Sequence, residues 1–406
     1  MQVIYERCCG MDIHKKSITA CMITPEGKEI RAFGTMTHEI QALVKWLKEH
    51  QCNTVAMEST GVYWKPIYNL LELSEIEAMV VNAQHIKAVP GRKTDVKDAE
   101  WIADLLRHGL LKGSYIPSRE QRELRELVRY RKSLIEERTR EVNRVQKVLE
   151  GCNIKLSSVV SDIMGVSSRS MIEAIINNIN DPELISKRGT GRLKSSRETL
   201  EQALNGLVGP HQRKMLAIQL KHIDFLDAEI KGLDREVAER LRPFEEDLEL
   251  LETIPGVGRR SAECILAEIG TDMNRFPSDA HLASWAGMSP GNNESAGKRK
   301  SGKTRKGNKK LRSTLVQCAH AAARSKETYL ASQYRRIAAR RGGNRAAVAV
   351  GHSILVIAYH ILKKHQPYHD LGANYFDERK SQSVLKNAVK RIESLGYSVI
   401  VEEKIA

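Results

Sequence analysis

The stretch CCGMDIHKKSITACMITPEGKEIRAFGT (residues 8–35) contains three runs of strand-forming residues separated by two polar turns. Apolar and β-branched residues recur in 8–13, 17–25 and 30–35, whereas HKK (14–16) and EGKE (26–29) are polar. Short runs of this kind, bounded by turn residues, are typical of consecutive strands. The chain is therefore expected to open with a three-stranded meander.

Beyond residue 35, helical and strand patterns alternate. Helices are expected over 38–50, 61–74 and 95–109, and strands over 53–58 and 76–82. A meander followed by strand–helix alternation predicts an α/β sheet with a mixed edge. That order matches the ribonuclease H-like (RuvC-like) fold, which we expect for residues 1–112.

Length and composition limit the class of protein. A chain of 406 residues with 41% hydrophobic and 28% charged residues predicts two or three globular domains. No uninterrupted apolar run near the length of a membrane span and no signal peptide are recognised, so we expect no membrane partner and a cytoplasmic location. The seven cysteines form no CxxC pair, which favours reduced thiols.

The positive charge is concentrated in one part of the chain. Of the net charge of +15, residues 291–345 carry +14, from sixteen Lys and Arg against two acids. The densest part, SAGKRKSGKTRKGNKKLR (295–312), has nine basic residues and no acid, and its Gly, Ser and Thr predict a mobile loop rather than a helix. A solvated tail is the simpler alternative, but the position between patterned segments favours nucleic-acid contact. The residues expected to make it are Lys298, Arg299, Lys300, Lys303, Arg305 and Lys306.

Long helices are expected over residues 113–245. Ser118 begins a capping box with Gln121. An apolar seam then runs from Leu124 to Leu149, interrupted by Arg131 and Arg138, and a second seam has eight apolar positions: Leu216, Leu220, Ile223, Leu226, Ile230, Leu233, Val237 and Leu241. The pattern fits an antiparallel pair, an intermolecular coiled coil, or helices folded into one compact domain.

A mainly α-helical domain is expected over 246–374. LLETIPGVGRRSAECILAEIG (250–270) predicts a helix, a turn at 255–258 and a second helix, which is the helix–hairpin–helix pattern. Gly256 and Gly258 would let backbone amides approach a phosphate, although an ordinary helix–helix corner has the same pattern. The tail, residues 375–406, is expected to contain a helix and a strand.

Four acids are candidate metal ligands. Asp12 lies in the first expected strand and Glu58 ends the fourth, the positions at which chemistry collects in a ribonuclease H-like sheet. Asp95 and Asp98 share one helical face, where they are also good helix caps. Hard oxygen ligands without His or Cys favour Mg²⁺, and two such ions assist phosphoryl transfer. We therefore expect the two helix acids to be ligands as well as caps.

Five segments together resemble a known family. They are GMDIHKK (10–16), AMESTGVYW (56–64), KTDVKDAEWIADLL (93–106), IPGVGRRSA (254–262) and ESAGKRKSGKTRKGNKKLR (294–312). In this order they resemble the DEDD transposases of bacterial insertion sequences, over nearly the whole chain. Those recombinases have a resolvase-like N-terminal domain and a C-terminal helix–hairpin–helix transposase domain.

The resemblance implies a mechanism and its residues. Asp12, Glu58, Asp95 and Asp98 would be the metal-binding tetrad, and Ser295 the catalytic serine, with Ser301 as the competing candidate. A noncoding bridge RNA would pair with target and donor DNA. Strand exchange would pass through a covalent phosphoserine in a homo-oligomer, a dimer or tetramer, where the acids of one subunit meet the serine of another.

Three functions are compatible with these residues. The first is an RNA-guided transposase, which needs the tetrad and the serine. The second is a structure-selective, metal-dependent nuclease of the Holliday-junction resolvase type, which needs only the acids, although the long segment beyond the first domain argues against it. The third is a non-enzymatic DNA-binding protein, in which the acids are only caps and no strand is broken.

Overall fold

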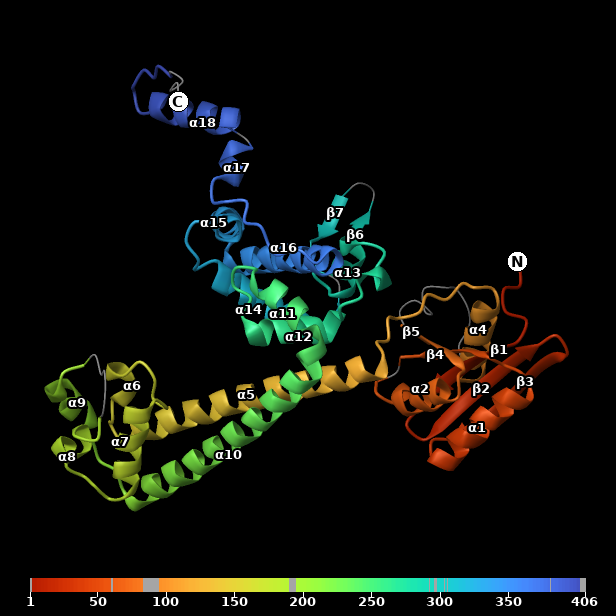
Figure 1. Ribbon diagram of the computed structural model, residues 1–406, viewed down its shortest axis with the longest axis horizontal. Helices are drawn as coiled ribbons and strands as arrows, with labels where there is room; N and C mark the ends of the chain where they lie inside the picture. Colours follow the sequence, from red (N-terminus) through yellow and green to blue (C-terminus); the bar gives the residue numbers. More distant parts are fainter. Residues whose placement is uncertain are drawn as a thin grey trace. The chain divides into compact units, whose positions relative to one another are not determined.

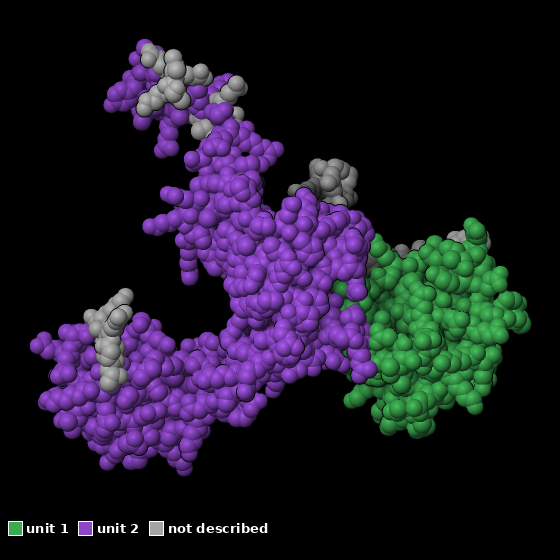
Figure 2. Space-filling model, viewed as in Figure 1, with its two compact units in different colours: residues 1–117 green, residues 118–406 purple. Residues whose placement is uncertain are grey.

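The computed structural model describes residues 2–59, 61–82, 95–189, 195–291, 293–295, 298–302, 304, 306–379 and 381–401. They belong to two units, Met1–Pro117 and Ser118–Ala406, which are coloured separately in Figure 2. A five-stranded sheet lies in the first unit, and the second is built mainly from helices with one two-stranded hairpin. The expected α/β N-terminal domain and largely helical remainder are therefore confirmed.

The strands of the first unit follow the order β3-β2-β1-β4-β5 (Figure 1). Antiparallel pairing joins β1 to β2 and β2 to β3, whereas β4 runs parallel to both β1 and β5. The sheet is thus mixed, as expected. Its elements are β1 Cys8–Ile13, β2 Ser17–Thr24, β3 Gly27–Gly34, α1 Thr37–Glu49, β4 Thr54–Glu58, α2 Trp64–Leu73, β5 Glu77–Val81 and α4 Asp95–Arg107.

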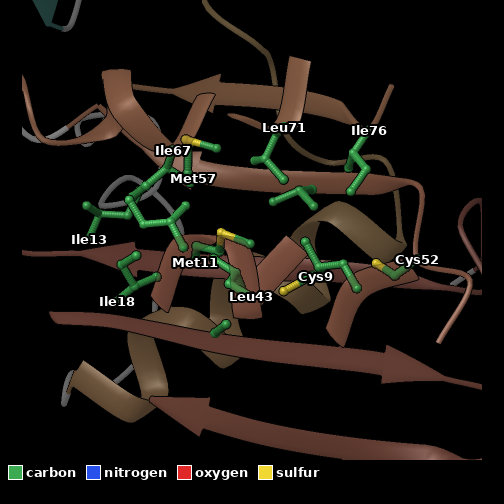
Figure 3. Packing of buried hydrophobic residues seen from close by; sticks show 14 of the residues in the cluster. Cys9, Met11, Ile13, Ile18, Leu43, Cys52, Met57, Ile67, Leu71 and Ile76 are labelled. Carbon is green, nitrogen blue, oxygen red and sulfur yellow. The ribbon is translucent and has the colours of Figure 1, made fainter. Parts of the chain in front are cut away.

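The two faces of this sheet pack against different helices. Met11 of β1 and Met57 of β4 belong to a buried cluster that includes residues of α1 and α2 (Figure 3). Cys8 and Ala56 belong instead to a cluster with Ala103 of α4. Because side chains alternate along a strand, β1 and β4 each present one face to the α1–α2 layer and the other to α4.

All the strands and helices expected in this unit are present, with ends that differ by a few residues. One of the larger differences is in β3, which begins at Gly27 rather than at residue 30. Thr24 pairs with Gly27 across a connection of Pro25 and Glu26, so the turn expected at 26–29 is too long. The exposed polar residue Lys28 joins the strand because backbone pairing to β2 does not require an apolar side chain.

The seven cysteines are free and buried, as expected for reduced thiols. Burial raises the pKa of the Cys52 thiol to about 11. It raises the pKa of Cys21 to about 11 as well, where the nearby Glu100 carboxylate adds to the effect. Both thiols therefore stay protonated near neutral pH and are weak nucleophiles.

Two long helices, α5 Arg119–Gly151 and α10 Pro210–Leu241, pack side by side in opposite directions (Figure 1). We call this pair the stem. Leu134 of α5 packs against Leu226 and Ile230 of α10, as the two apolar seams predict. Ser118 is the N-cap of α5 and accepts a hydrogen bond from the Gln121 amide, at 3.4 Å. Of the arrangements that the sequence left open, the chain contains the antiparallel pair.

A small group of helices lies between the two stem helices in the sequence and was not expected. It packs with the ends of the stem helices around Leu149 and Leu216. Its members are α6 Leu156–Val159, α7 Val166–Ile176, α8 Pro182–Ser186 and α9 Arg197–Leu204. Three of them are too short to produce a strong periodic signal, which is why sequence patterns did not reveal them.

The remaining helices surround α16, which packs against α13, α14 and α15. The elements are η1 Arg242–Phe244, α11 Glu245–Glu252, α12 Arg259–Ile269, η2 Met273–Arg275, α13 Asp279–Trp285, β6 Asn293–Ser295, β7 Lys298–Ser301, α14 Lys309–Ala322, α15 Tyr329–Arg341 and α16 Gly343–Lys364. Among the described helices, α16 is the one long and apolar enough on average to cross a membrane, although His352, Ser353 and His360 interrupt its apolar residues. Of its apolar window, 56% is buried, as in the core helix of a folded domain.

The C-terminal tail contains α17 Tyr375–Glu378 and α18 Ser381–Glu393. The strand expected near the end of the chain is wrong for the described residues, since 394–401 pair with no other strand. Ile400 is 88% exposed. An apolar run forms a stable strand only when a neighbouring strand is available to pair with it.

Candidate active site and nucleic-acid interface

Asp12 and Glu58 lie at the carboxyl ends of adjacent parallel strands. Met11 pairs with Met57 across β1 and β4, so the next residue on each strand is Asp12 and Glu58 respectively. Because Met11 and Met57 face the α1–α2 layer, alternation places both acids on the α4 face of the sheet. Asp12 is only 6% exposed, and Glu58 is partly buried.

Helix α4 brings Asp98 to the same region. A Cβ atom at Gly10 would lie 2.2 Å from the Ala103 nitrogen and 2.4 Å from the Ala99 carbonyl oxygen, so α4 crosses β1 at this glycine. Asp12 is two residues from Gly10 on the same face of β1, and Asp98 directly precedes Ala99. The partly buried Asp98 therefore begins the part of α4 that covers the acid-bearing end of the strands.

Asp95 is the first residue of α4, one helical turn before Ala99. Its side chain lies outside the described residues. Within the part of the chain that the structure describes, no three His, Cys, Asp or Glu side chains are grouped closely enough to hold one ion. The described donors, three carboxylates, are the oxygen ligands that Mg²⁺ prefers, so the donor chemistry fits that ion.

His14 is a member of this region that sequence patterns did not single out. Its Nε2 atom lies 3.2 Å from Oδ2 of Asp12, and its side chain is half exposed. The His14 amide also donates to the Ser17 carbonyl oxygen at 2.9 Å, which closes the β1–β2 turn. The HKK motif at this turn was interpreted only as a connection, although a His two residues after an acid in a strand can reach the same face.

The two helices and the intervening turn expected at 250–270 are present, as α11 and α12, but the two glycines of the turn have different surroundings. Gly256 has φ of +86°, and a Cβ atom there would lie 2.4 Å from the Cys318 carbonyl oxygen of α14. A Cβ atom at Gly258, the N-cap of α12, would meet nothing within 4 Å. Gly256 therefore permits close packing on α14, and Gly258 is the one of the two that leaves room for a ligand.

The arginines after this turn are neutralised within the chain. Arg259 makes two hydrogen bonds to the Glu245 carboxylate, at 2.5 and 2.6 Å, and this pairing raises the pKa of the guanidinium. Arg260 donates to Asp234 at 2.7 Å. The turn therefore contributes less free positive charge than its sequence suggests.

Part of the basic segment 295–312, which was expected to be a mobile loop, belongs instead to a β-hairpin formed by β6 and β7. Ser295 of β6 pairs with Lys298 of β7, and Asn293 pairs with Ser301 at the other end of the hairpin. Pairing of two short strands supplies backbone hydrogen bonds that a composition rich in Gly and Ser does not reveal. The side chains of 293–301, and the whole of Lys303 and Arg305, lie outside the described residues, whereas Lys306 is exposed.

The base of the hairpin is held by described residues. Asn308 caps α14 through Oδ1, which accepts from the amides of Lys310 and Leu311 at 3.2 and 3.1 Å. Its Nδ2 donates to Glu268 of α12 at 2.6 Å. Glu268 is 1% exposed and also accepts two hydrogen bonds from Arg129 of α5. A buried ionic group thus links the stem to the start of α14.

Two family models match the chain, one in its N-terminal part and one in its C-terminal part. One, described as "Transposase" and built for DEDD transposases of the IS110 type, matches residues 9–154, which include all four acids. The other, described as "Transposase IS116/IS110/IS902 family", matches residues 248–335, which include the turn at 255–258, α12 and the basic hairpin.

Several curated proteins are similar over most of their length. The transposase for insertion sequence element IS1111A of Coxiella burnetii is 23% identical over 88% of this chain and 90% of its own length. A 44.8 kDa protein of insertion element IS116 of Streptomyces clavuligerus is 26% identical over 69% and 75%. The pilin gene-inverting protein of Moraxella lacunata is 22% identical over 88% and 96%. The chain belongs to the IS110/IS116/IS902 family of transposases.

Proposed function

We propose that this transposase cleaves and rejoins DNA with Mg²⁺ bound by Asp12, Glu58, Asp95 and Asp98. The observation that carries the proposal is the placement of three of these acids, on β1, β4 and the start of α4, at one edge of a sheet in the family-matched region. The strand order β3-β2-β1-β4-β5 supports a ribonuclease H-like (RuvC-like) fold. When bound there, the metal would supply charge stabilisation at the reacting phosphate.

The acids would each have a defined task. Asp12 and Glu58 project from paired strands and would hold cations against a rigid sheet. Asp98 would add an oxygen ligand from α4, and its position in the first turn also suits the helix dipole. The His14 imidazole, 3.2 Å from Asp12, would orient that carboxylate.

We further propose Ser295 as the nucleophile. Attack of its hydroxyl on a DNA phosphate would form a serine–phosphate ester and release a deoxyribose hydroxyl. Attack by the hydroxyl of another strand would then restore the serine and rejoin the DNA, so no phosphodiester energy is lost. Lys298 lies opposite Ser295 in the hairpin register, which places a cation-bearing residue beside the reacting group. Ser301, at the other end of the hairpin, is the second candidate.

The remaining parts of the proposal concern partners. A noncoding bridge RNA from the element would select target and donor DNA by base pairing. The enzyme would act in the bacterial cytoplasm as a dimer or tetramer, so that the acids of one subunit meet the serine of another. Of the two turn glycines, Gly258 is the one that would contact a phosphate, because Gly256 packs on α14. The other phosphate contacts would come from Lys298, Arg299, Lys300, Lys303, Arg305 and Lys306.

The acids are tested by isosteric amides. Asp12→Asn, Glu58→Gln, Asp95→Asn and Asp98→Asn are each expected to abolish strand breakage while DNA binding, measured by fluorescence anisotropy, is largely kept. Asp104→Asn is the matched control, because Asp104 is also on α4 but its half-exposed carboxylate lies 3.5 Å from Nδ1 of His108. The expected role of Asp98 as a helix cap does not fit α4, which begins at Asp95. Near-normal cleavage by Asp98→Asn would therefore leave that residue only a favourable interaction with the helix dipole, worth about 0.5 kcal/mol.

The serine is tested by trapping. On a DNA substrate that cannot religate, wild-type protein should give a protein–DNA adduct that survives denaturation and maps to residues 295–301. Ser295→Ala should eliminate the adduct, and Ser301→Ala should retain it. The opposite result would transfer the role to Ser301. A Holliday-junction resolvase-like nuclease, which the family membership does not favour, would release free ends and leave cleavage intact in both variants.

The RNA guide is tested by its removal. Recombination in vitro is expected to require RNA transcribed from the DNA that flanks the reading frame, and to stop after ribonuclease treatment. Adding a transcript with an altered pairing segment should redirect the reaction to the matching DNA. Efficient recombination at one fixed site by protein that carries no RNA would exclude the guide.

A further inference from the structure

An open groove of ≈ 1270 Å³ lies in the second unit between the base of the hairpin and helices α14, α15 and α16. Gly302 and Thr304 line it on the hairpin side. Arg312 of α14, Arg341 of α15 and Arg345 of α16 contribute three guanidinium groups, and none of the described lining residues is an acid. A concave surface with charge of one sign concentrates the electrostatic potential and attracts a polyanion.

Within the part of the chain that the structure describes, no carboxylate neutralises these three arginines. Arg341 and Arg345 are exposed, and among the described residues neither has a carboxylate at ion-pairing distance. Arg312 donates to the Gly287 carbonyl oxygen and to Thr304 Oγ1, neutral acceptors that orient it without cancelling its charge. By contrast, Arg336, one and a half turns earlier on α15 than Arg341, pairs with Asp377 at 2.6 Å.

The two exposed arginines flank the junction between α15 and α16. Gly342 has φ of +83°, which ends α15 and starts the 22-residue helix α16 without a side-chain cap. A Cβ atom at Gly342 would meet nothing within 4 Å. Asn344 and Arg345, in the first turn of α16, line the groove, so the positive end of the helix dipole adds to the guanidinium charge.

The rest of the groove lining is mixed. Ile337 of α15 and Val348 of α16 are apolar, and the polar side chains are Gln333, Asn344, His352 and Ser353. Arginines bind phosphate oxygens with good geometry, and neutral polar side chains also donate hydrogen bonds to phosphate and sugar oxygens. Three guanidinium groups with neutral polar side chains between them therefore suit a sugar–phosphate backbone.

We infer that this groove binds the backbone of the DNA strand that is cleaved, with Arg312, Arg341 and Arg345 on successive phosphates. The choice of DNA rests on the proposed function, because the groove wall at Gly302 directly follows the hairpin that contains both candidate serines. A DNA strand bound at the base of the hairpin would lie close to the nucleophilic serine, because the same hairpin contains that serine. None of these three arginines belongs to the run of basic residues in and just after the hairpin, 298–306.

The test uses the full chain and the salt dependence of its binding to a labelled DNA duplex of arbitrary sequence. The double variant Arg341→Gln/Arg345→Gln should lower the slope of log affinity against log salt by about two units, roughly one for each lost phosphate contact. Arg341→Lys/Arg345→Lys should restore most of the slope, because the charge is kept. Arg336→Gln is the matched control on α15 and should leave the slope unchanged, since that arginine is already paired.

Each other outcome is decisive. An unchanged slope in the double Gln variant, with a normal circular dichroism spectrum, would refute the inference. A slope that falls only for RNA transcribed from the flanking DNA would refute the assignment to DNA. The salt-dependence measurement is independent of strand cleavage. A normal protein–DNA adduct together with an unchanged slope would refute DNA binding by the groove and support the serine mechanism. A lowered slope without any protein–DNA adduct would support DNA binding by the groove and refute the serine mechanism.

Discussion

The second unit contains arginines of two kinds, those in and near the stem and those in the groove. Arg131 of the stem is 4% exposed at its side chain and pairs with Glu263 at 2.6 Å and Asp234 at 3.0 Å. Arg341 and Arg345 of the groove have no acidic partner among the described residues and face solvent. The same residue type thus holds helices together in one region and is available to an external anion in the other.

The comparison shows why a count of basic residues is a poor guide to a binding surface. In the stem, Arg131 and Arg138 interrupt the apolar seam of α5, and both meet aspartates of α10. The pairing offsets most of the cost of removing a guanidinium from water. Only arginines that lack such partners keep a field that reaches a nucleic acid.

The largest loss of stability is expected when the ion pairs of the stem arginines are broken at Glu268. Glu268→Gln leaves Arg129 and Arg125 without the buried carboxylate that both contact, and should lower the free energy of unfolding by about 3 kcal/mol. Native-state hydrogen exchange of α12 amides in increasing urea measures it. Glu123→Gln is the control, because Glu123 is exposed and its pairs with Arg119 and Arg240 are screened by water. Equal losses in both variants would contradict the distinction.

A smaller effect is expected halfway along the stem. The side chains of Arg138 and Asp227 are 32% and 38% exposed, so water screens their pair. A double-mutant cycle of Arg138→Gln and Asp227→Asn should give a coupling of about 0.5 kcal/mol. A coupling energy as large as the loss of unfolding free energy at Glu268 would mean that the strength of the stem ion pairs does not depend on their exposure to solvent.

A pH effect that is smaller still is expected beside the groove. Burial lowers the pKa of His352, against an opposing effect of the Asp279 carboxylate. The neutral imidazole is favoured in the folded protein, so its contribution to stability is complete above the ordinary histidine pKa of about 6.5 and is lost as the pH falls through the lower folded value. His352→Asn should therefore flatten the fall in unfolding free energy below about pH 6.5. The exposed His211→Asn should not change it.

The smallest effect on stability is expected for the groove itself. Arg341→Gln/Arg345→Gln should leave the unfolding free energy unchanged, because exposed residues without ion-pair partners contribute little to the fold. The same hydrogen-exchange measurement on α16 amides checks this. A clear loss of hydrogen-exchange protection would show that these arginines stabilise the fold as the stem arginines do, which would contradict the distinction between the two regions.

The elements of the first unit were predictable because strand and helix signals are local. Alternating apolar residues in 8–24 and the periodic pattern of 95–109 need no knowledge of distant parts of the chain. The hairpin at 293–301 and the helices between α5 and α10 were missed, because short elements exist only through their neighbours. The metal role of the four acids and the role of Ser295 remain predictions.

The sequence alone determined which residues form the five-stranded sheet and the two stem helices, where most of the positive charge lies and which acids end the strands. Tertiary structure decided which partner each group meets. The register of β1 with β4 puts Asp12 next to Glu58. The close approach of α14 explains why a residue without a side chain is needed at position 256. The antiparallel packing of the stem gives Arg131 and Arg138 their aspartate partners. Local patterns depend on neighbours three or four residues away, whereas the environment of a charge depends on groups a hundred residues distant, which only folding brings within reach.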